Sequence, residues 1–169
     1  MNWSDLEQIV EQYQSMVFSI ALRMTNDRGL AEEIAQDVFL ELDRRAGSFE
    51  SEEHLCHWLR RVAMSRSTDA LRRRRVQRID QWVELEERHS AIEGASSSVL
   101  SARMEAMLAE LPEHQRAALI LRYQEDLTPE EIATTLSAPV ATVKSQLQRG
   151  LKQLRTLAES RLKEFCRGA

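Results

Sequence analysis

The sequence predicts an all-α protein made of two small helical domains. Leu, Ala, Glu, Arg and Gln dominate its 169 residues, and these are strong helix formers. Aromatic residues make up only 5% of the chain, which also has just 5 Gly and 3 Pro, so the signals of strands and tight turns are scarce. Apolar residues recur at helical spacing in several segments that polar breaks separate. A chain of this length has room for one domain or two small ones.

Three helices are expected in the first 80 residues. The first covers 4–24, where apolar side chains return every three or four positions. The break at 26–29 has the sequence Asn-Asp-Arg-Gly, which ends helices and caps new ones. The second helix is expected at 30–45 and is followed by a loop at 47–51. The third begins at residue 52 or 53 and ends at 75.

Four more helices are expected at about 99–165. An acidic and then small, polar stretch at 81–98 precedes them, and we interpret it as a flexible linker. The first of the four covers about 99–110, and the second begins near Pro112, since proline favours the first helical turn. The predicted domains are therefore residues 1–80 and 99–169.

The last two helices form a predicted helix-turn-helix. Thr128-Pro129-Glu130-Glu131 is a capping box, in which Thr is the N-cap and Glu stands at the third helical position. This helix is expected to end near Leu136. A short turn at 137–139 and a long helix from Val140 follow, in the order that DNA-binding helix-turn-helix motifs have.

The formal net charge of −4 hides a strong asymmetry. The segment 27–53 carries nine acids and three arginines, whereas 60–78 carries one acid, Asp69, and eight arginines. A basic stripe is typical of nucleic-acid binding, and an acidic stripe beside it indicates a second, different partner.

Several functional classes are not expected. No apolar run reaches the roughly 18 residues of a membrane span, and the first residues lack the basic and apolar parts of a signal peptide. Cys56 and Cys166 lie far apart, which suits a reducing cytoplasm. His54, Cys56 and His57 are too few for a structural zinc site, and no acid pair accompanies a nucleophile or a glycine-rich phosphate loop. We therefore expect no catalytic residue, no metal site and no cofactor.

The second helix has two contrasting faces. Its predicted core face consists of Ala31, Ile34, Ala35, Val38, Phe39 and Leu42. The opposite face consists of Glu33, Gln36, Asp37, Leu40 and Arg44. This could be an ordinary solvated face, but an apolar Leu40 ringed by acids and an amide is more typical of a protein-binding surface.

The third helix is predicted to present a basic face. Trp58, Leu59, Val62, Ala63 and Ala70 are assigned to its inner side, and Asp69 is placed near that side as a structural carboxylate. The outer side has Arg60, Arg61, Met64, Thr68, Leu71 and Arg75, with Arg72 at the edge. A solubilising face paired with nearby acids is one interpretation. DNA binding by Arg60, Arg61, Thr68, Arg72 and Arg75 is the other, because arginine recognises phosphate and stacks on bases.

The long last helix has the pattern of a recognition helix. Its predicted packed stripe is Val143, Leu147, Leu151 and Leu154. The candidate DNA-binding residues are Thr142, Lys144, Ser145, Gln148, Arg149 and Lys152. The earlier polar residues would reach base edges and the later cations phosphates. A helical hairpin without a DNA role is the alternative, and Gly150 is expected to allow close helix packing.

Three sets of residues, in chain order, resemble the motifs of one family. The first is AEEIAQDVFL at 31–40, and the second is Trp58-Leu59-x-x-Val62-Ala63 with Asp69-x-Leu71-Arg72. The third combines Leu111-Pro112-x-x-x-Arg116, Glu131-Ile132-Ala133 and Thr142-Val143-Lys144-Ser145. Together they resemble the extracytoplasmic-function (ECF) sigma factors, subunits that direct bacterial RNA polymerase to promoters. The resemblance covers nearly the whole chain.

The resemblance implies a role for each surface. Glu33, Gln36 and Asp37 would bind the clamp helices of the polymerase β′ subunit, and the β subunit would be a further contact. The basic third helix and the loop at 47–51 would handle the minus-ten element. Lys144, Ser145 and Arg149 would read the minus-thirty-five element, and the linker would thread through the polymerase. It also implies an anti-sigma partner and action in the bacterial cytoplasm, on the nucleoid when in holoenzyme.

The sequence departs from the family pattern at four positions. Ser65, Ala141, Gln146 and Gly150 stand where the family commonly has Asn, Gly, Arg and Ala. These departures bear on promoter preference rather than on the roles of the two domains. A stand-alone helix-turn-helix regulator and a pure protein-binding adaptor are the alternative functions, although each leaves one of the two charged surfaces without a role.

Overall fold

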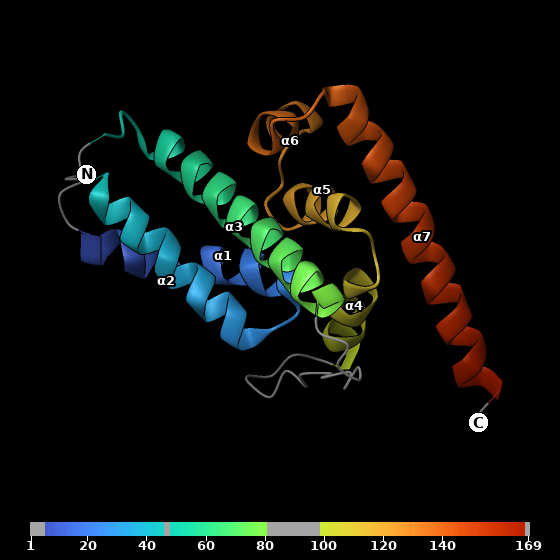
Figure 1. The fold of residues 1–169 in the computed structure, drawn as a ribbon. Coiled ribbons are helices and arrows are strands. Elements are labelled where there is room, and N and C mark those ends of the chain that lie inside the picture. The colour runs from blue at the N-terminus through green and yellow to red at the C-terminus, as the bar shows by residue number, and fades with distance from the viewer. Residues whose placement is uncertain (1–5, 46–47, 81–98, 168–169) are drawn as a thin grey trace. The chain divides into compact units, whose positions relative to one another are not determined.

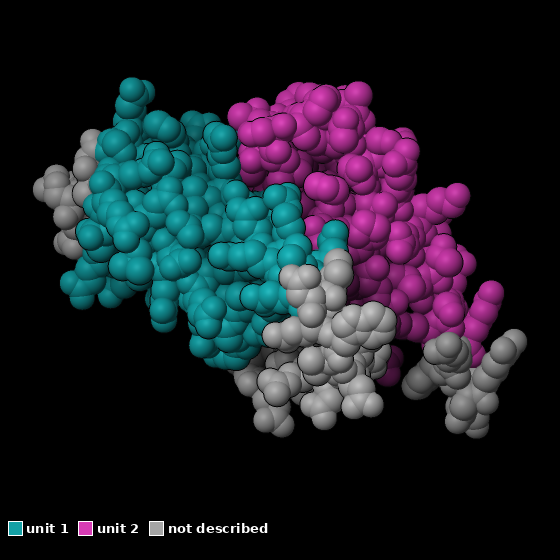
Figure 2. Space-filling view, viewed as in Figure 1, with its two compact units in different colours: residues 1–92 teal, residues 93–169 magenta. Residues whose placement is uncertain are grey.

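The structure is a computed structural model that describes residues 6–45, 48–80 and 99–167. These residues form seven α-helices and no strand (Figure 1). The chain divides into two compact units, residues 1–92 and 93–169 (Figure 2). The predicted all-α architecture in two small units is confirmed. The segment interpreted as a linker, 81–98, lies outside the described residues, as do positions 4 and 5 of the first predicted helix.

Unit 1 is a bundle of three helices around one apolar core. The helices are α1 (Leu6–Thr25), α2 (Arg28–Arg44) and α3 (Glu52–Asp80), and α1 packs against both of the others. Each contributes fully buried side chains: Val17, Ile20 and Met24 from α1, Val38 from α2, and Leu55, Leu59 and Met64 from α3. Each such burial contributes about 1.5–3 kcal/mol to folding, which makes this core the main source of stability of the unit.

Asp27 fixes the start of α2. Its Oδ1 accepts a hydrogen bond of 2.9 Å from the backbone N–H of Leu30, and its Oδ2 accepts one of 2.7 Å from Arg74 Nη2 on α3. The hydrogen bond from Leu30, with help from Arg74, lowers the pKa of the Asp27 carboxyl despite its partial burial. Because Asp27 is the N-cap, α2 begins at Arg28, two residues before the predicted start.

A second polar cluster attaches the first turn of α3 to α1. Tyr13 Oη donates a hydrogen bond of 2.7 Å to Glu52 Oε1, and Gln12 Nε2 donates one of 2.8 Å to the same atom. Burial and the neighbouring carboxylate raise the pKa of the Tyr13 hydroxyl, and these hydrogen bonds lower the pKa of Glu52. The start of α3 is therefore held by a charge-assisted contact.

Three predictions for α3 were wrong. The helix continues to Asp80 rather than ending at 75. Met64 was assigned to the outer side, but it is only 1% exposed. Asp69 was placed near the inner side, but it is exposed and lies 3.8 Å from Arg72. Since α3 packs against α1 and α2 together, its buried face is wider than a single stripe and is rotated toward Met64.

Unit 2 contains α4 (Val99–Ala109), α5 (Glu113–Tyr123), α6 (Pro129–Leu136) and α7 (Val140–Arg167). The middle of α5 is buried from Ala117 to Leu121, and Ile132 and Val143 complete the core from α6 and α7. Arg116 is also buried, and its Nη2 donates to the carbonyls of Ala109 and Leu111 at the end of α4. The arginine thereby satisfies backbone groups that the end of a helix leaves open.

The packed stripe of α7 differs from the predicted one at a single position. Val143 is buried and Leu147 and Leu154 are half-buried, as predicted. Leu151 is 44% exposed, so its assignment to the stripe was wrong. Gly150 is buried in its place and lies against α5. The glycine brings the α7 backbone close to α5, and the contact therefore passes through residue 150 and leaves 151 outside.

Candidate functional site

The outer face of α2 displays the four residues predicted for protein binding. Glu33, Gln36, Asp37 and Leu40 are all exposed, and Leu40 is 56% exposed. On the opposite face Ala31, Ile34, Val38 and Leu42 are buried as predicted, whereas Ala35 and Phe39 are only half-buried. We refer to Glu33, Gln36, Asp37 and Leu40 as the α2 face.

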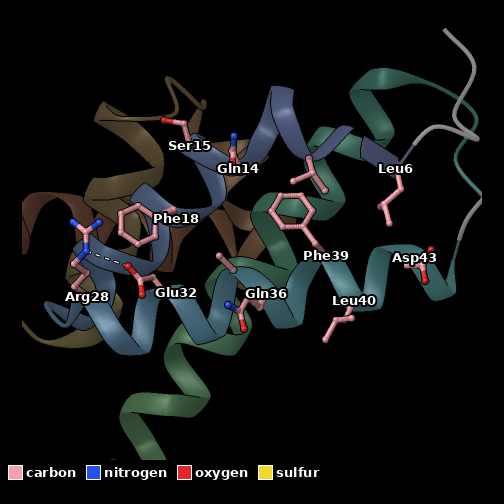
Figure 3. Close-up of a pocket in the computed structure, with 12 residues that line it drawn as sticks. Leu6, Gln14, Ser15, Phe18, Arg28, Glu32, Gln36, Phe39, Leu40 and Asp43 are labelled. Carbon is pink, nitrogen blue, oxygen red and sulfur yellow. Dashed lines mark hydrogen bonds and ion pairs between the residues drawn. The ribbon is translucent and has the colours of Figure 1, made fainter. Parts of the chain in front are cut away.

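A groove of about 810 Å³ lies between α1 and α2, beside the α2 face. Figure 3 shows Phe18 and Phe39 between the two helices, with Gln36 and Leu40 on α2. Val10 on α1 adds to the apolar lining. This groove was not predicted from the sequence. The available signal was an apolar stripe on each helix too wide for the core alone, and the surplus residues line the groove.

The two ends of the groove are charged. The Arg28 guanidinium lies 5.7 Å from the Phe18 ring centroid, a cation–π distance, and its Nε lies 3.1 Å from Glu32 Oε1. Asp43 lines the groove together with Leu40 (Figure 3). Since Gln36 and Leu40 belong both to the groove and to the α2 face, the two form one continuous surface with an apolar centre and polar edges.

Asp37 has an intramolecular partner on α3 that was not predicted from the sequence. Arg66 Nη1 on α3 lies 3.2 Å from Asp37 Oδ2, and Arg66 Nη2 lies 2.7 Å from Glu41 Oε2. Asp37 and Glu41 stand one turn apart on α2, so the arginine spans both. Sequence spacing alone could not pair residues that are 29 and 25 positions apart.

The five candidate DNA-binding residues of α3 share one side of the helix. Arg61, Arg72 and Arg75 are exposed, and Arg60 and Thr68 are half-buried. The Thr68 hydroxyl donates a hydrogen bond of 2.9 Å to the Met64 carbonyl within the helix. Arg66 pairs with acids of α2 and Arg74 with the α2 N-cap Asp27, whereas Arg72 lies 3.8 Å from Asp69 of its own helix. Pairing with acids therefore accounts for Arg66 and Arg74, and DNA binding by the five candidate residues stays a prediction.

Aromatic contacts anchor the described end of the loop between α2 and α3. Phe49 is buried, and its ring lies edge-on to His54 at 5.5 Å and to Trp58 at 5.4 Å between centroids. The Arg45 guanidinium lies 5.6 Å from the Trp58 centroid. Such edge-to-face pairs favour one arrangement of the rings. Residues 48–51 are thus attached to the first half of α3.

The helix-turn-helix has the predicted caps. Thr128 Oγ1 accepts from the N–H of Glu131, and the Glu131 carboxylate accepts from the N–H of Thr128, so both bonds of the capping box are present. Helix α6 ends at Leu136 as predicted. Ser137 has the left-handed conformation, with φ of 52°, and reverses the chain before Val140.

The candidate DNA-binding residues of α7 lie near its start. Thr142, Lys144, Gln148, Arg149 and Lys152 are exposed, and Ser145 is half-buried. Lys144 Nζ lies 3.5 Å from Glu130 Oε1 on α6, which is an exposed contact of little strength. The structure therefore brings all six side chains to the accessible part of the helix that follows the turn.

The described residues contain no group of three His, Cys, Asp or Glu side chains arranged to hold a metal ion. Cys56 is half-buried, and its Sγ lies 4.0 Å from Met16 Sδ. Within the described part of the chain, no helix combines the length and the apolarity that crossing a bilayer requires.

Comparisons with known proteins match both units. The family model described as Sigma-70 region 2 matches residues 9–76, and the one described as Sigma-70, region 4 matches residues 101–154. The RNA polymerase sigma-H factor of Pseudomonas aeruginosa is 30% identical over 168 residues, which cover 92% of this chain and 87% of that protein. The ECF RNA polymerase sigma factor SigE of Mycolicibacterium smegmatis is 31% identical over 88% of this chain and 60% of its own length.

A solved structure has the same fold. The sigma factor RpoE of Bartonella quintana, crystallised with the anti-sigma factor NepR, has a TM-score of 0.73 at 22% identity. The similarity covers 92% of this chain and 98% of that one. Two sigma regions matched in chain order favour a sigma factor over a stand-alone helix-turn-helix regulator. With a relative 30% identical along almost the whole length, they show that the chain belongs to the ECF group of RNA polymerase sigma factors and directs promoter-specific initiation of transcription.

Proposed function

We propose that this sigma factor binds core RNA polymerase through the α2 face, with the clamp helices of the β′ subunit as the partner surface. The observation that carries the proposal is the exposure of Glu33, Gln36, Asp37 and Leu40 on one side of α2, next to an apolar groove. An exposed leucine flanked by acids and an amide fits a protein interface, because such interfaces combine an apolar centre with a polar rim. The β subunit is the proposed second contact.

The proposed minus-ten surface is the basic side of α3. Arg60, Arg61, Thr68, Arg72 and Arg75 contact the DNA there. The guanidinium groups bind phosphates and stack on the unpaired bases that strand opening exposes, which suits arginine better than lysine. Because Phe49 anchors residues 48–51 to the same helix, the loop presents its end beside this surface.

The proposed minus-thirty-five surface is the start of α7. Thr142, Lys144, Ser145, Gln148, Arg149 and Lys152 contact the DNA there. Polar side chains of the first turns read base edges in the major groove, and the later cations bind phosphates. The capping box of α6 and the left-handed Ser137 support this assignment, since they fix the angle between the two helices.

We assign one role to each part of the chain. Residues 1–80 bind polymerase and the minus-ten element, 81–98 form an acidic linker, and 99–169 bind the minus-thirty-five element. The protein has no catalytic residue and requires no metal or cofactor, because the polymerase performs the chemistry. It acts in the bacterial cytoplasm, and on the nucleoid when it is part of the holoenzyme.

An anti-sigma factor is the further proposed partner. The Bartonella quintana relative was crystallised with one, which is the support from the comparisons. The apolar groove and the α2 face offer a continuous surface for it. An inhibitor on this surface would exclude the polymerase directly.

Co-elution with bacterial core RNA polymerase in gel filtration tests the proposal. The wild type is compared with the double variant Glu33→Lys, Asp37→Lys. A matched control, Glu7→Lys, Glu11→Lys, changes the net charge equally at exposed positions of α1 outside the α2 face. Wild type and control should co-elute with the polymerase, and the α2 variant should elute alone. A wild type that does not bind the polymerase contradicts the proposal and favours the stand-alone regulator.

A further inference from the structure

We infer that Arg66 is a positioning residue for the α2 face: its guanidinium holds the Asp37 and Glu41 carboxylates in the arrangement that meets the polymerase. This inference rests on the proposed function of the α2 face. Arg66 belongs to α3 and lies outside that face, so it acts through the two acids.

The contacts of Arg66 involve both terminal nitrogens. Nη1 lies 3.2 Å from Asp37 Oδ2, and Nη2 lies 2.7 Å from Glu41 Oε2. The Asp37 side chain nevertheless stays 56% exposed, whereas those of Arg66 and Glu41 are 35% and 26% exposed. One oxygen of Asp37 is thus fixed by Arg66, while the carboxylate as a whole remains open to a partner.

The third guanidinium nitrogen of Arg66, Nε, indicates which groups orient the side chain. Nε is buried and has no hydrogen-bond partner among the described residues. A buried N–H without an acceptor is unfavourable, and the two charge-assisted bonds at the terminal nitrogens offset that penalty. The guanidinium is therefore oriented by Asp37 and Glu41 rather than by the surroundings of Nε.

The competing explanation is that Arg66 only stabilises the packing of α3 against α2 through an ion pair. The chain contains a second ion pair of this kind. Arg74 also reaches from α3 to an acid of α2, with its Nη2 2.7 Å from Asp27 Oδ2. Asp27 caps the start of α2 and lies outside the α2 face. Removing Arg74 thus breaks a comparable ion pair between the same helices without touching the acids of the face.

If Arg66 positions the two acids, its removal should lower the affinity of the protein for core polymerase. An exposed carboxylate without Arg66 samples several rotamers, and binding must then order it at an entropic cost. Arg66→Ala should therefore weaken binding of core polymerase about 3- to 10-fold, which corresponds to ordering roughly one side chain. The loss should occur even though the substitution makes the α2 face more acidic.

The experiment measures the Kd of the full-length protein for core polymerase, together with the thermal midpoint, for Arg66→Ala, Arg66→Lys and Arg74→Ala. Both alanine variants should lower the midpoint. At a temperature where all variants are folded, only Arg66→Ala and Arg66→Lys should raise the Kd, because lysine cannot span two carboxylates with one fork. Equal affinity losses in Arg66→Ala and Arg74→Ala, or full affinity in Arg66→Lys, would overturn the inference.

A double-mutant cycle separates this inference from the proposed function. In an Asp37→Asn, Glu41→Gln background, Arg66→Ala should cause no further loss of affinity. An additional loss there would show that Arg66 acts independently of the acids and would also overturn the inference. If the wild type itself fails to bind core polymerase, the proposed function fails. If the wild type binds and Arg66→Ala binds equally or more tightly, only the positioning role fails.

Discussion

Gly150 on α7 lies directly against Leu119 on α5: a Cβ on Gly150 would stand 2.9 Å from Leu119 Cδ1. The same atom would stand 3.3 Å from Leu119 Cγ and 3.4 Å from Gln115 Cβ. Leu119 is buried, so its side chain has little room to withdraw. The glycine therefore sets how closely the recognition helix approaches α5.

Gly150→Ala should lower the free energy of unfolding of the second unit by about 1 kcal/mol. Alanine gains about 1 kcal/mol of helix propensity, but overpacking against Leu119 costs about 1–3 kcal/mol. Urea unfolding measures the difference. Adding Leu119→Val makes room, so the double variant should be more stable than the sum of the single effects predicts. A stabilised Gly150→Ala protein would contradict the packing argument.

Asp27→Asn should destabilise the first unit at neutral pH and have little effect in acid. Asparagine keeps the N-cap but loses the ion pair with Arg74. The pKa of Asp27 is lowered in the folded protein. Its charge therefore stabilises the fold above the pKa of the unfolded chain, about 4, and that contribution disappears as the pH falls through the folded-state pKa.

Denaturant unfolding of wild type and Asp27→Asn at several pH values tests this dependence. The stability gap should be largest near pH 7 and should close as the pH falls through the folded-state pKa of Asp27. Asp27→Ala is the control for the cap, and it should remain destabilised by about 1 kcal/mol after the Asp27→Asn gap has closed. A gap in Asp27→Asn that does not change with pH would mean that the charge of Asp27 contributes nothing.

Local sequence signals predicted the helices well. The capping box at Thr128 and Glu131 was predictable because both of its bonds join residues three positions apart. Helical periodicity also placed Ala31, Ile34, Val38 and Leu42 of α2 in the core, where they are buried. Met64 was assigned wrongly, since α3 packs against two helices and the width of its buried face depends on tertiary contacts. Leu151 was assigned wrongly because Gly150 shifts the contact of α7.

The candidate site was only partly predictable, for a similar reason. Exposure of the α2 face follows from helical periodicity alone. The groove requires two helices whose surplus apolar residues, such as Phe18 and Phe39, come to face each other. The pairing of Arg66 with Asp37 requires the register of α3 against α2. No periodicity within one helix contains that information.

Arg116→Met should lower the free energy of unfolding of the second unit by about 2 kcal/mol. Arg116 is buried, and its Nη2 lies 2.5 Å from the Ala109 carbonyl and 3.0 Å from the Leu111 carbonyl. Methionine retains apolar volume but leaves both oxygens without this donor. Arg155→Met, at an exposed position of α7, should change stability by less than about 0.5 kcal/mol. Thermal unfolding of both variants makes the comparison, and equal effects would contradict the capping role of Arg116.

Gln148→Ala and Lys152→Ala should weaken promoter binding by the holoenzyme in different ways. Gln148 lies nearer the start of α7, and an amide recognises a base edge, so its loss should reduce discrimination between the correct and a scrambled minus-thirty-five element by about 1–3 kcal/mol. Lys152 lies one turn later and presents a charge that suits a phosphate. Its loss should weaken binding of both sequences equally.

Salt titration of the same two variants separates the roles further. Each phosphate contact adds about 0.9 to the slope of log K against log salt concentration. Lys152→Ala should therefore reduce that slope by about one, and Gln148→Ala should leave it unchanged. The reverse assignment, with a salt effect for Gln148 and a sequence effect for Lys152, would mean that α7 enters the groove in a different orientation. Gly150 stands between Gln148 and Lys152 and fixes the approach of α7 to α5. Gly150→Ala should therefore change the sequence discrimination and the salt dependence of promoter binding together.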